Sequence, residues 1–89
     1  MENNVVFIGK KETMAYIMAL THQSMTERKI LIKARGKSIS KAVDVTLIAL
    51  DRFMQDWKAK EIKISTEERT QENQEKQRVS CISIEINKK

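Results

Sequence analysis

The chain has 89 residues and a net charge of +5 at pH 7, which predicts one small domain over residues 1–89 and favours a polyanionic partner or an anionic membrane surface. With one cysteine and one histidine, the chain can form neither an internal disulfide nor a multi-ligand His/Cys metal site, so we expect no cofactor. No apolar run approaches the roughly 18 to 20 residues that span a bilayer, and the first residues lack a signal-peptide layout, so we expect an intracellular, cytoplasmic protein that does not insert into a membrane.

The first expected element is a strand at Asn4 to Ile8, a continuous apolar run that ends at Gly9. Apolar residues at both parities are typical of a strand that is buried on both faces. After Lys10 and Lys11, the sequence predicts a helix over Glu12 to Met25. One face of this helix carries Met14, Ile17, Met18 and Thr21. We expect its methionines to pack in the core, as flexible apolar side chains commonly do.

The second expected strand, Lys29 to Lys33, is apolar at its centre and also leads into a glycine, Gly36, that has basic neighbours. Ser38 is the expected N-cap of a long second helix. Two apolar stripes follow along that helix, Ile39, Val43, Leu47, Leu50 and Met54 on one and Val45, Ile48, Ala49 and Phe53 on the other. A thin two-layer domain seldom buries so wide an arc, so we expect part of it to form a subunit contact.

The last third of the chain predicts a β-hairpin, because the apolar period changes from near four to two after Trp57. Apolar and polar residues alternate over residues 61–64 and again between Val79 and Ile86, with a polar tract between them that we read as a long tip. A change of phase near residues 80–82 permits a bulge there. Trp57 itself either covers the core or joins Phe53 in an exposed association patch, and the second interpretation is preferred.

The expected order of strands and helices is βαβαββ, and its two strand-glycine-helix units predict a ligand-binding edge. A crossover of this length usually joins parallel neighbouring strands, so both basic turns should lie at the carboxyl edge of the sheet, where open α/β sheets bind ligands. Cations beside the free N–H groups of a helix N-terminus suit phosphate oxygens. The candidate nucleic-acid-binding residues are Lys10, Lys11, Lys33, Arg35, Gly36, Lys37 and Lys41. A merely solvated surface is the alternative, and the convergence of two clusters favours a binding face.

Two stretches of the sequence resemble the signatures of a known family. Residues 5–11 (VVFIGKK) and 32–44 (IKARGKSISKAVD) are similar to those of the Alba family, small archaeal chromatin proteins, and residues 52–53 and 78–89 also fit. The resemblance implies an α+β fold, a two-layer βαβαββ domain with a mixed sheet, like the C-terminal domain of translation initiation factor three. It also implies a homodimer that binds double-stranded DNA and RNA without sequence preference.

The same resemblance assigns roles to single residues. Lys10, Lys11 and Arg35 match the family's nucleic-acid contacts, with Lys33 and Lys37 nearby. Phe53 matches a residue that joins one dimer to the next. The hairpin departs from the family, because residues 65–78 carry Glu67, Glu68, Glu72 and Glu75 against Arg69, Lys76 and Arg78. An arm with net negative charge should clamp DNA weakly.

The expected function is sequence-independent binding of double-stranded DNA by an architectural, chromosome-associated chromatin protein. The alternative is an RNA-binding protein that uses the same basic face, in RNA protection or as part of a ribonucleoprotein. An enzyme is not expected, because the sequence fixes no nucleophile or orienting acid near His22, and Cys81 suits strand packing.

Overall fold

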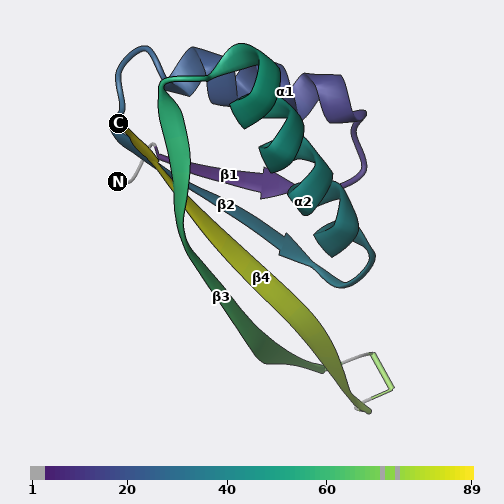
Figure 1. Cartoon of the computed structure of the whole chain (residues 1–89). Helices are drawn as coiled ribbons and strands as arrows, with labels where there is room; N and C mark the ends of the chain where they lie inside the picture. The colour runs from purple at the N-terminus through teal and green to yellow at the C-terminus, as the bar shows by residue number, and fades with distance from the viewer. Residues whose placement is uncertain (1–3, 71, 74) are drawn as a thin grey trace.

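The computed structural model describes residues 4–70, 72–73 and 75–89. Its helices and strands are β1 (Val5–Ile8), α1 (Thr13–Gln23), β2 (Lys29–Arg35), α2 (Ile39–Ile48), β3 (Trp57–Thr70) and β4 (Lys76–Lys88). A 3₁₀ turn, η1 (Gly36–Ser38), leads into α2, and a π turn, η2 (Ala49–Phe53), extends it. The predicted α+β fold with the order βαβαββ is therefore confirmed (Figure 1).

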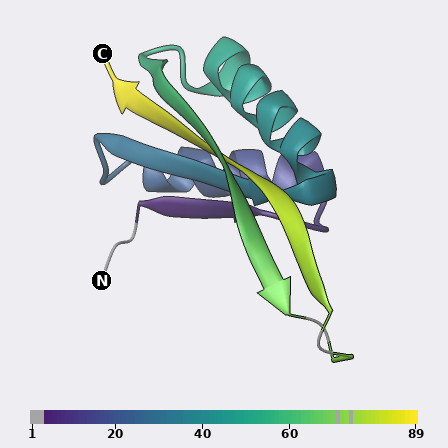
Figure 2. The same ribbon diagram turned by 90° about the horizontal axis from the view of Figure 1, so that it is seen from below.

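The four strands form one mixed sheet in the order β1-β2-β4-β3. Strands β1 and β2 are parallel, whereas β4 runs antiparallel to both β2 and β3. Both helices lie on the same face of this sheet, so the domain has two layers (Figure 2). No helix among the residues that the structure describes covers the other face of the sheet, and we call it the open face.

Burial alternates along β1 and β2 because only one face of the sheet is covered. In β2 the side chains of Ile30, Ile32 and Ala34 are buried under the helices, while Lys33 on the open face is only half-buried. The expectation that β1 is buried on both faces is wrong, since Phe7 is 67% exposed. The core as a whole comprises Val6, Ile8, Tyr16, Ile17, Leu20, Ile30, Ile32, Ala34, Ala42, Val45, Ala49, Met54, Trp57, Ile84 and Ile86.

Helix α1 packs on the sheet through Tyr16, Ile17 and Leu20. The expected core positions Met14 and Met18 are instead 50% and 66% exposed. The buried side of α1 is centred on Tyr16, Ile17 and Leu20, and the hydroxyl of Tyr16 accepts hydrogen bonds from the loop before the helix. The methionines then fall on the outer side of the helix.

Neither of the two apolar stripes predicted for α2 is buried as a unit, because Ile48 and Phe53 are exposed on the same stripe as the buried Val45. Ala42, Val45 and Ala49 are fully buried, whereas Val43 and Leu47 remain exposed. Apolar side chains are thus left uncovered on this helix, as its sequence predicts. Ser38 precedes α2 but its side chain makes no capping hydrogen bond, because η1 already forms the first turn.

Trp57 lies in the core and is 3% exposed, so its preferred assignment to an exposed association patch is wrong. It is the first residue of β3 and stands opposite Lys88 at the end of β4. Its indole closes the core beside Met54, which is also buried.

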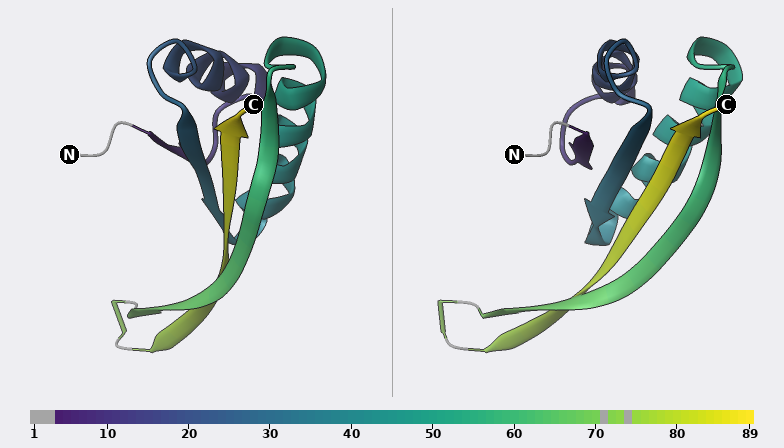
Figure 3. Two further views of the ribbon diagram at one scale, coloured as in Figure 1. Left: turned by 60° about the vertical axis from the view of Figure 1, so that its left-hand side comes forward. Right: turned by 90° about the vertical axis from the view of Figure 1, so that its left-hand side faces the viewer.

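The hairpin of β3 and β4 is longer than its apolar pattern predicts. The two strands pair from Trp57 opposite Lys88 to Thr70 opposite Lys76, so most of the polar tract is strand rather than tip. Backbone groups form this ladder, and polar side chains are therefore compatible with it. The register shift lies between Ala59 and Glu61, while pairing across Ser80–Ile82 is regular, contrary to the predicted bulge. The hairpin projects beyond the helices as an arm, and the molecule is 46 Å long (Figure 3).

Candidate nucleic-acid interface

Two basic turns lie side by side at one edge of the sheet: residues 9–11, the first turn, and residues 35–37, the second turn. Ile8 and Ala34 are partners near the carboxyl ends of parallel strands β1 and β2, so the residues that follow them leave from the same edge. Lys10 and Lys11 are exposed in the first turn, and Lys37 is exposed in the second. Residues that are more than twenty positions apart in the sequence are therefore neighbours on one surface, as the predicted crossover requires.

Two side chains hold the first turn in place. The hydroxyl oxygen of Tyr16 accepts hydrogen bonds from the backbone N–H of Gly9 at 2.8 Å and from that of Lys11 at 3.0 Å. The ammonium of Lys41, on α2, donates to the carbonyl oxygen of Gly9 at 3.1 Å and to that of Lys11 at 2.8 Å. The first turn is thus bonded to both helices, and Lys41 connects it to the element that follows the second turn.

The second turn depends on a glycine. Gly36 has a φ of 53°, in the left-handed region that L side chains rarely adopt. A Cβ atom there would have space, since it would be 3.6 Å from Cγ1 of Val79, so conformation rather than crowding favours glycine. The turn ends β2 at Arg35 and starts η1, which places Lys37 beside Arg35 at the entrance to α2.

Arg35 forms an ion pair with the arm. Its Nη1 atom is 3.1 Å from Oε1 of Glu67, and both side chains are about half exposed. Glu67 therefore lies over the basic edge instead of pointing away from it. This contact joins the second turn to β3 and places an acid where an incoming phosphate would meet Arg35.

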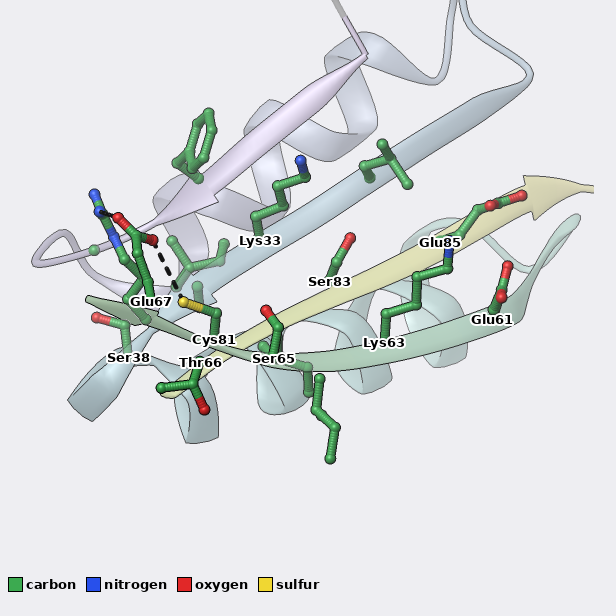
Figure 4. A pocket seen from close by; sticks show the side chains of 18 of the residues that line it. Lys33, Ser38, Glu61, Lys63, Ser65, Thr66, Glu67, Cys81, Ser83 and Glu85 are labelled. Atoms are coloured by element: carbon green, nitrogen blue, oxygen red, sulfur yellow. Dashed lines mark hydrogen bonds and ion pairs between the residues drawn. The ribbon is translucent and has the colours of Figure 1, made fainter. Parts of the chain in front are cut away.

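The other carboxylate oxygen of Glu67 is occupied by a thiol. Cys81 Sγ donates a hydrogen bond to Oε2 of Glu67 at 3.5 Å, drawn as a dashed line in Figure 4. Burial of the thiol, then this hydrogen bond and the negative charge of Glu67, raise the pKa of Cys81. The positive charge of Arg35 acts in the opposite direction and lowers it. The three side chains form a connected polar cluster at the root of the arm.

The open face continues from this edge across the sheet. Lys33 in β2 stands opposite Ser83 in β4, which in turn stands opposite Lys63 in β3. Their side chains project from the same side of the sheet, together with the acids Glu61 and Glu85 (Figure 4). The open face therefore carries mixed charge, whereas the edge with the two turns presents the exposed lysines Lys10, Lys11 and Lys37.

Alternation divides the acids of the arm between its two faces. Glu67 shares the open face with Arg35, whereas Glu68 stands opposite Arg78 on the other face. The sequence predicts that alternate residues of the hairpin point to opposite faces, but the contact of Glu67 with Arg35 depends on the strand register. Tyr16 is absent from the predicted site, because its sequence position indicates only a helix face.

Outside the basic edge, α2, η2 and β3 also expose large apolar side chains. They are Val43, Leu47, Ile48, Phe53, Ile62 and Ile64, and we call them the apolar surface. Leu47 is 61% exposed and Ile64 is 80% exposed. Exposed large apolar side chains such as these are candidates for an association site.

Within the described part of the chain, no group of three or more His, Cys, Asp or Glu side chains is placed to hold a metal ion. None of the helices in these same residues is long and apolar enough to cross a membrane.

The fold and the edge define a small basic α+β domain with two clustered loops and a projecting hairpin, and known proteins share this architecture. The family model for Alba matches residues 4–67. The DNA/RNA-binding protein Alba of Thermoplasma acidophilum is 52% identical over 67 residues, which covers 74% of this chain and 75% of that protein. The protein of the same name from Methanocella arvoryzae is 43% identical over 84 residues, 93% of this chain and 88% of that one.

The solved structure of Alba from Thermoplasma volcanium superposes with a TM-score of 0.89 at 44% identity, and the match covers 96% of this chain and all of that one. This chain belongs to the Alba family. The family model ends at Glu67, whereas the matches to the Methanocella arvoryzae protein and to the solved structure extend over 93% and 96% of this chain.

Proposed function

We propose that this protein binds double-stranded DNA without sequence preference and acts as an architectural chromatin protein. The observation that carries the proposal is the convergence of the two basic turns on one sheet edge, where Ile8 and Ala34 are paired and Lys41 bonds the first turn to α2. Cations clustered beside a helix start suit phosphate oxygens, which carry no sequence information. Binding by this edge is therefore expected to depend on backbone charge.

The residues have distinct proposed roles. Lys10, Lys11 and Lys37 are exposed point charges for phosphate, and Arg35 offers a planar fork for two phosphate oxygens. Gly36 gives the second turn its left-handed conformation. Lys33 lies behind Arg35 on the open face and adds charge without standing at the edge itself.

The names of the relatives support a nucleic-acid ligand, and they include both DNA and RNA. The proteins from Thermoplasma acidophilum and Methanocella arvoryzae are both named DNA/RNA-binding protein Alba. RNA bound by the same basic edge is therefore the second candidate, since phosphate contacts do not by themselves distinguish the two polymers. These names describe binding and not catalysis, and we propose a binding protein. A location in the cytoplasm on the chromosome follows from the DNA-binding role.

We further propose a homodimer that associates through the apolar surface. Leu47 and Val43 on α2 are exposed beside the buried face of the same helix, and Ile62 and Ile64 are exposed on β3. A thin domain gains stability when a partner subunit covers such side chains. Phe53, 47% exposed in η2, is proposed to join one dimer to the next on DNA.

The test is the affinity for duplex DNA as a function of salt concentration. If a dimer neutralises on the order of six to ten phosphates, log affinity falls against log salt with a slope of about −0.9 per contact, and a scrambled duplex binds equally well. A salt-independent complex that selects one sequence would contradict the proposal. Competition between duplex DNA and structured RNA at the same salt concentration decides between the two ligands.

A further inference from the structure

The first turn has an unusual set of backbone hydrogen bonds. The N–H and C=O groups of Gly9 and of Lys11 are all bonded, and only two side chains provide the partners. Tyr16 accepts from both N–H groups through one oxygen, and Lys41 donates to both carbonyl oxygens through one nitrogen. The turn is too short for regular structure of its own, so these bonds determine its conformation.

Lys41 is one of the candidate binding residues, and its geometry indicates a different task. Two of the three N–H bonds of its ammonium are directed at backbone carbonyl oxygens of the first turn. The side chain is half-buried, while Lys10 and Lys11 are exposed. Its charge is therefore directed at the turn, where carbonyl dipoles offset the repulsion from the two neighbouring lysines.

Tyr16 provides the complementary restraint from α1. Its ring is buried in the core, and only its hydroxyl reaches the turn. A buried ring has few accessible rotamers, so the position of its oxygen is well defined. A Cβ atom at Gly9 would be 3.4 Å from this oxygen, which makes the approach of the turn to Tyr16 close.

We infer, resting on the proposed function, that Tyr16 and Lys41 are positioning residues that order the first turn before nucleic acid binds. They present Lys10 and Lys11 to phosphate in a fixed place next to Arg35. Ordering the turn in advance removes a conformational entropy cost from the binding step. Neither residue needs to touch the ligand for this effect.

Tyr16→Phe is the most direct test, because it keeps the buried ring and the net charge and removes only the shared acceptor. Amide hydrogen exchange at Gly9 and Lys11 should accelerate, while the midpoint of thermal unfolding shows whether the core is intact. Affinity for duplex DNA should fall about fivefold to tenfold, as expected for the loss of two hydrogen bonds that order the turn. The slope of log affinity against log salt should stay the same, because no phosphate contact is removed.

Lys41→Met and Lys41→Arg form a second, matched pair of variants. Lys41→Met retains the aliphatic stem and loses the donors, whereas Lys41→Arg retains donors and charge and should restore most of the affinity. If Lys41 contacts phosphate directly, Lys41→Met lowers the salt slope by about one per subunit while Tyr16→Phe leaves binding unchanged, and this pair of results would overturn the inference.

Combination of Tyr16→Phe with Lys10→Ala, Lys11→Ala separates the positioning role of Tyr16 from the phosphate-binding role of the two lysines. In that background Tyr16→Phe should have little further effect on affinity, because the turn no longer carries charges to position. An equal loss in both backgrounds, or wild-type affinity in Tyr16→Phe alone, would overturn the inference and leave the proposed function standing. Wild-type affinity in the Lys10, Lys11 variant would overturn the proposed function, and the inference with it.

Discussion

Glu67→Gln should tighten the binding of nucleic acid, because it frees Arg35. Glu67 Oε1 is 3.1 Å from Nη1 of Arg35, so a phosphate must displace the carboxylate before it meets the guanidinium. The glutamine has nearly the same shape and no charge. It therefore leaves the strand pairing of β3 intact and removes the competitor.

The size of the effect follows from the exposure of the pair. The side chains of Arg35 and Glu67 are 49% and 48% exposed, and exposed ion pairs contribute about 0.2–1 kcal/mol. Releasing Arg35 should then increase affinity by about 1.4-fold to fivefold per site, beyond what the change in net charge alone produces. Glu68→Gln supplies the comparison, because it removes the same charge one residue along the strand, on the face away from Arg35.

Fluorescence anisotropy with a labelled duplex at fixed salt measures both variants against the wild-type protein. The expected order of affinity is Glu67→Gln above Glu68→Gln above wild type. Equal affinities for the two variants would show that Glu67 acts only through long-range charge. Weaker binding by Glu67→Gln would mean that the contact between Glu67 and Arg35 positions the guanidinium for phosphate instead of blocking it.

Three further predictions concern other parts of the molecule. Alkylation of Cys81 should begin at a lower pH in Glu67→Gln than in the wild-type protein, because Glu67 raises the pKa of the thiol and the variant removes that charge. An unchanged pH profile would mean that burial alone raises the pKa of Cys81. Leu47→Glu should convert the dimer to monomers in sedimentation, whereas Met18→Glu, at a similarly exposed position on α1, should not; dimers in both variants would remove α2 from the interface. Phe53→Ala should keep the dimer and reduce cooperativity on long DNA, and monomers in that variant would assign Phe53 to the dimer contact instead.

The arrangement of the first two strands and helices could be predicted from the sequence, because it depends on local patterns. Each apolar run followed by glycine and a 3.6-residue period gives a strand and a helix, and the handedness of the crossover makes the strands parallel. The convergence of Lys10 and Lys11 with Arg35 follows from that topology alone. The parallel pairing of Ile8 with Ala34 agrees with it.

Other features depend on contacts that the sequence pattern does not contain. Met14 and Met18 have helical spacing, but the buried side of α1 is the side from which Tyr16 reaches the first turn. The polar half of β3 has no apolar alternation, and its strand forms because the backbone of β4 pairs with it.

The polar cluster of Arg35, Glu67 and Cys81 also depends on contacts that the sequence pattern does not contain. The ion pair of Glu67 with Arg35 spans 32 positions and depends on the register of three strands. The role of Lys41 could not be predicted either, since its two acceptors are backbone atoms of a distant turn.

The most direct test of a single phosphate-binding edge is the change in salt slope when its charges are removed together. Lys10→Ala, Lys11→Ala, Arg35→Ala should lower the magnitude of the slope of log affinity against log salt by about 2.7 per subunit, at about 0.9 per lost contact. The control variant Lys58→Ala, Lys60→Ala, Lys89→Ala removes the same charge from exposed positions at the opposite end of the sheet. The control should leave the slope nearly unchanged, whereas the edge variant should lose most of it. Equal changes in slope for the two variants would contradict a single phosphate-binding edge, because binding would then follow net charge and not the two turns.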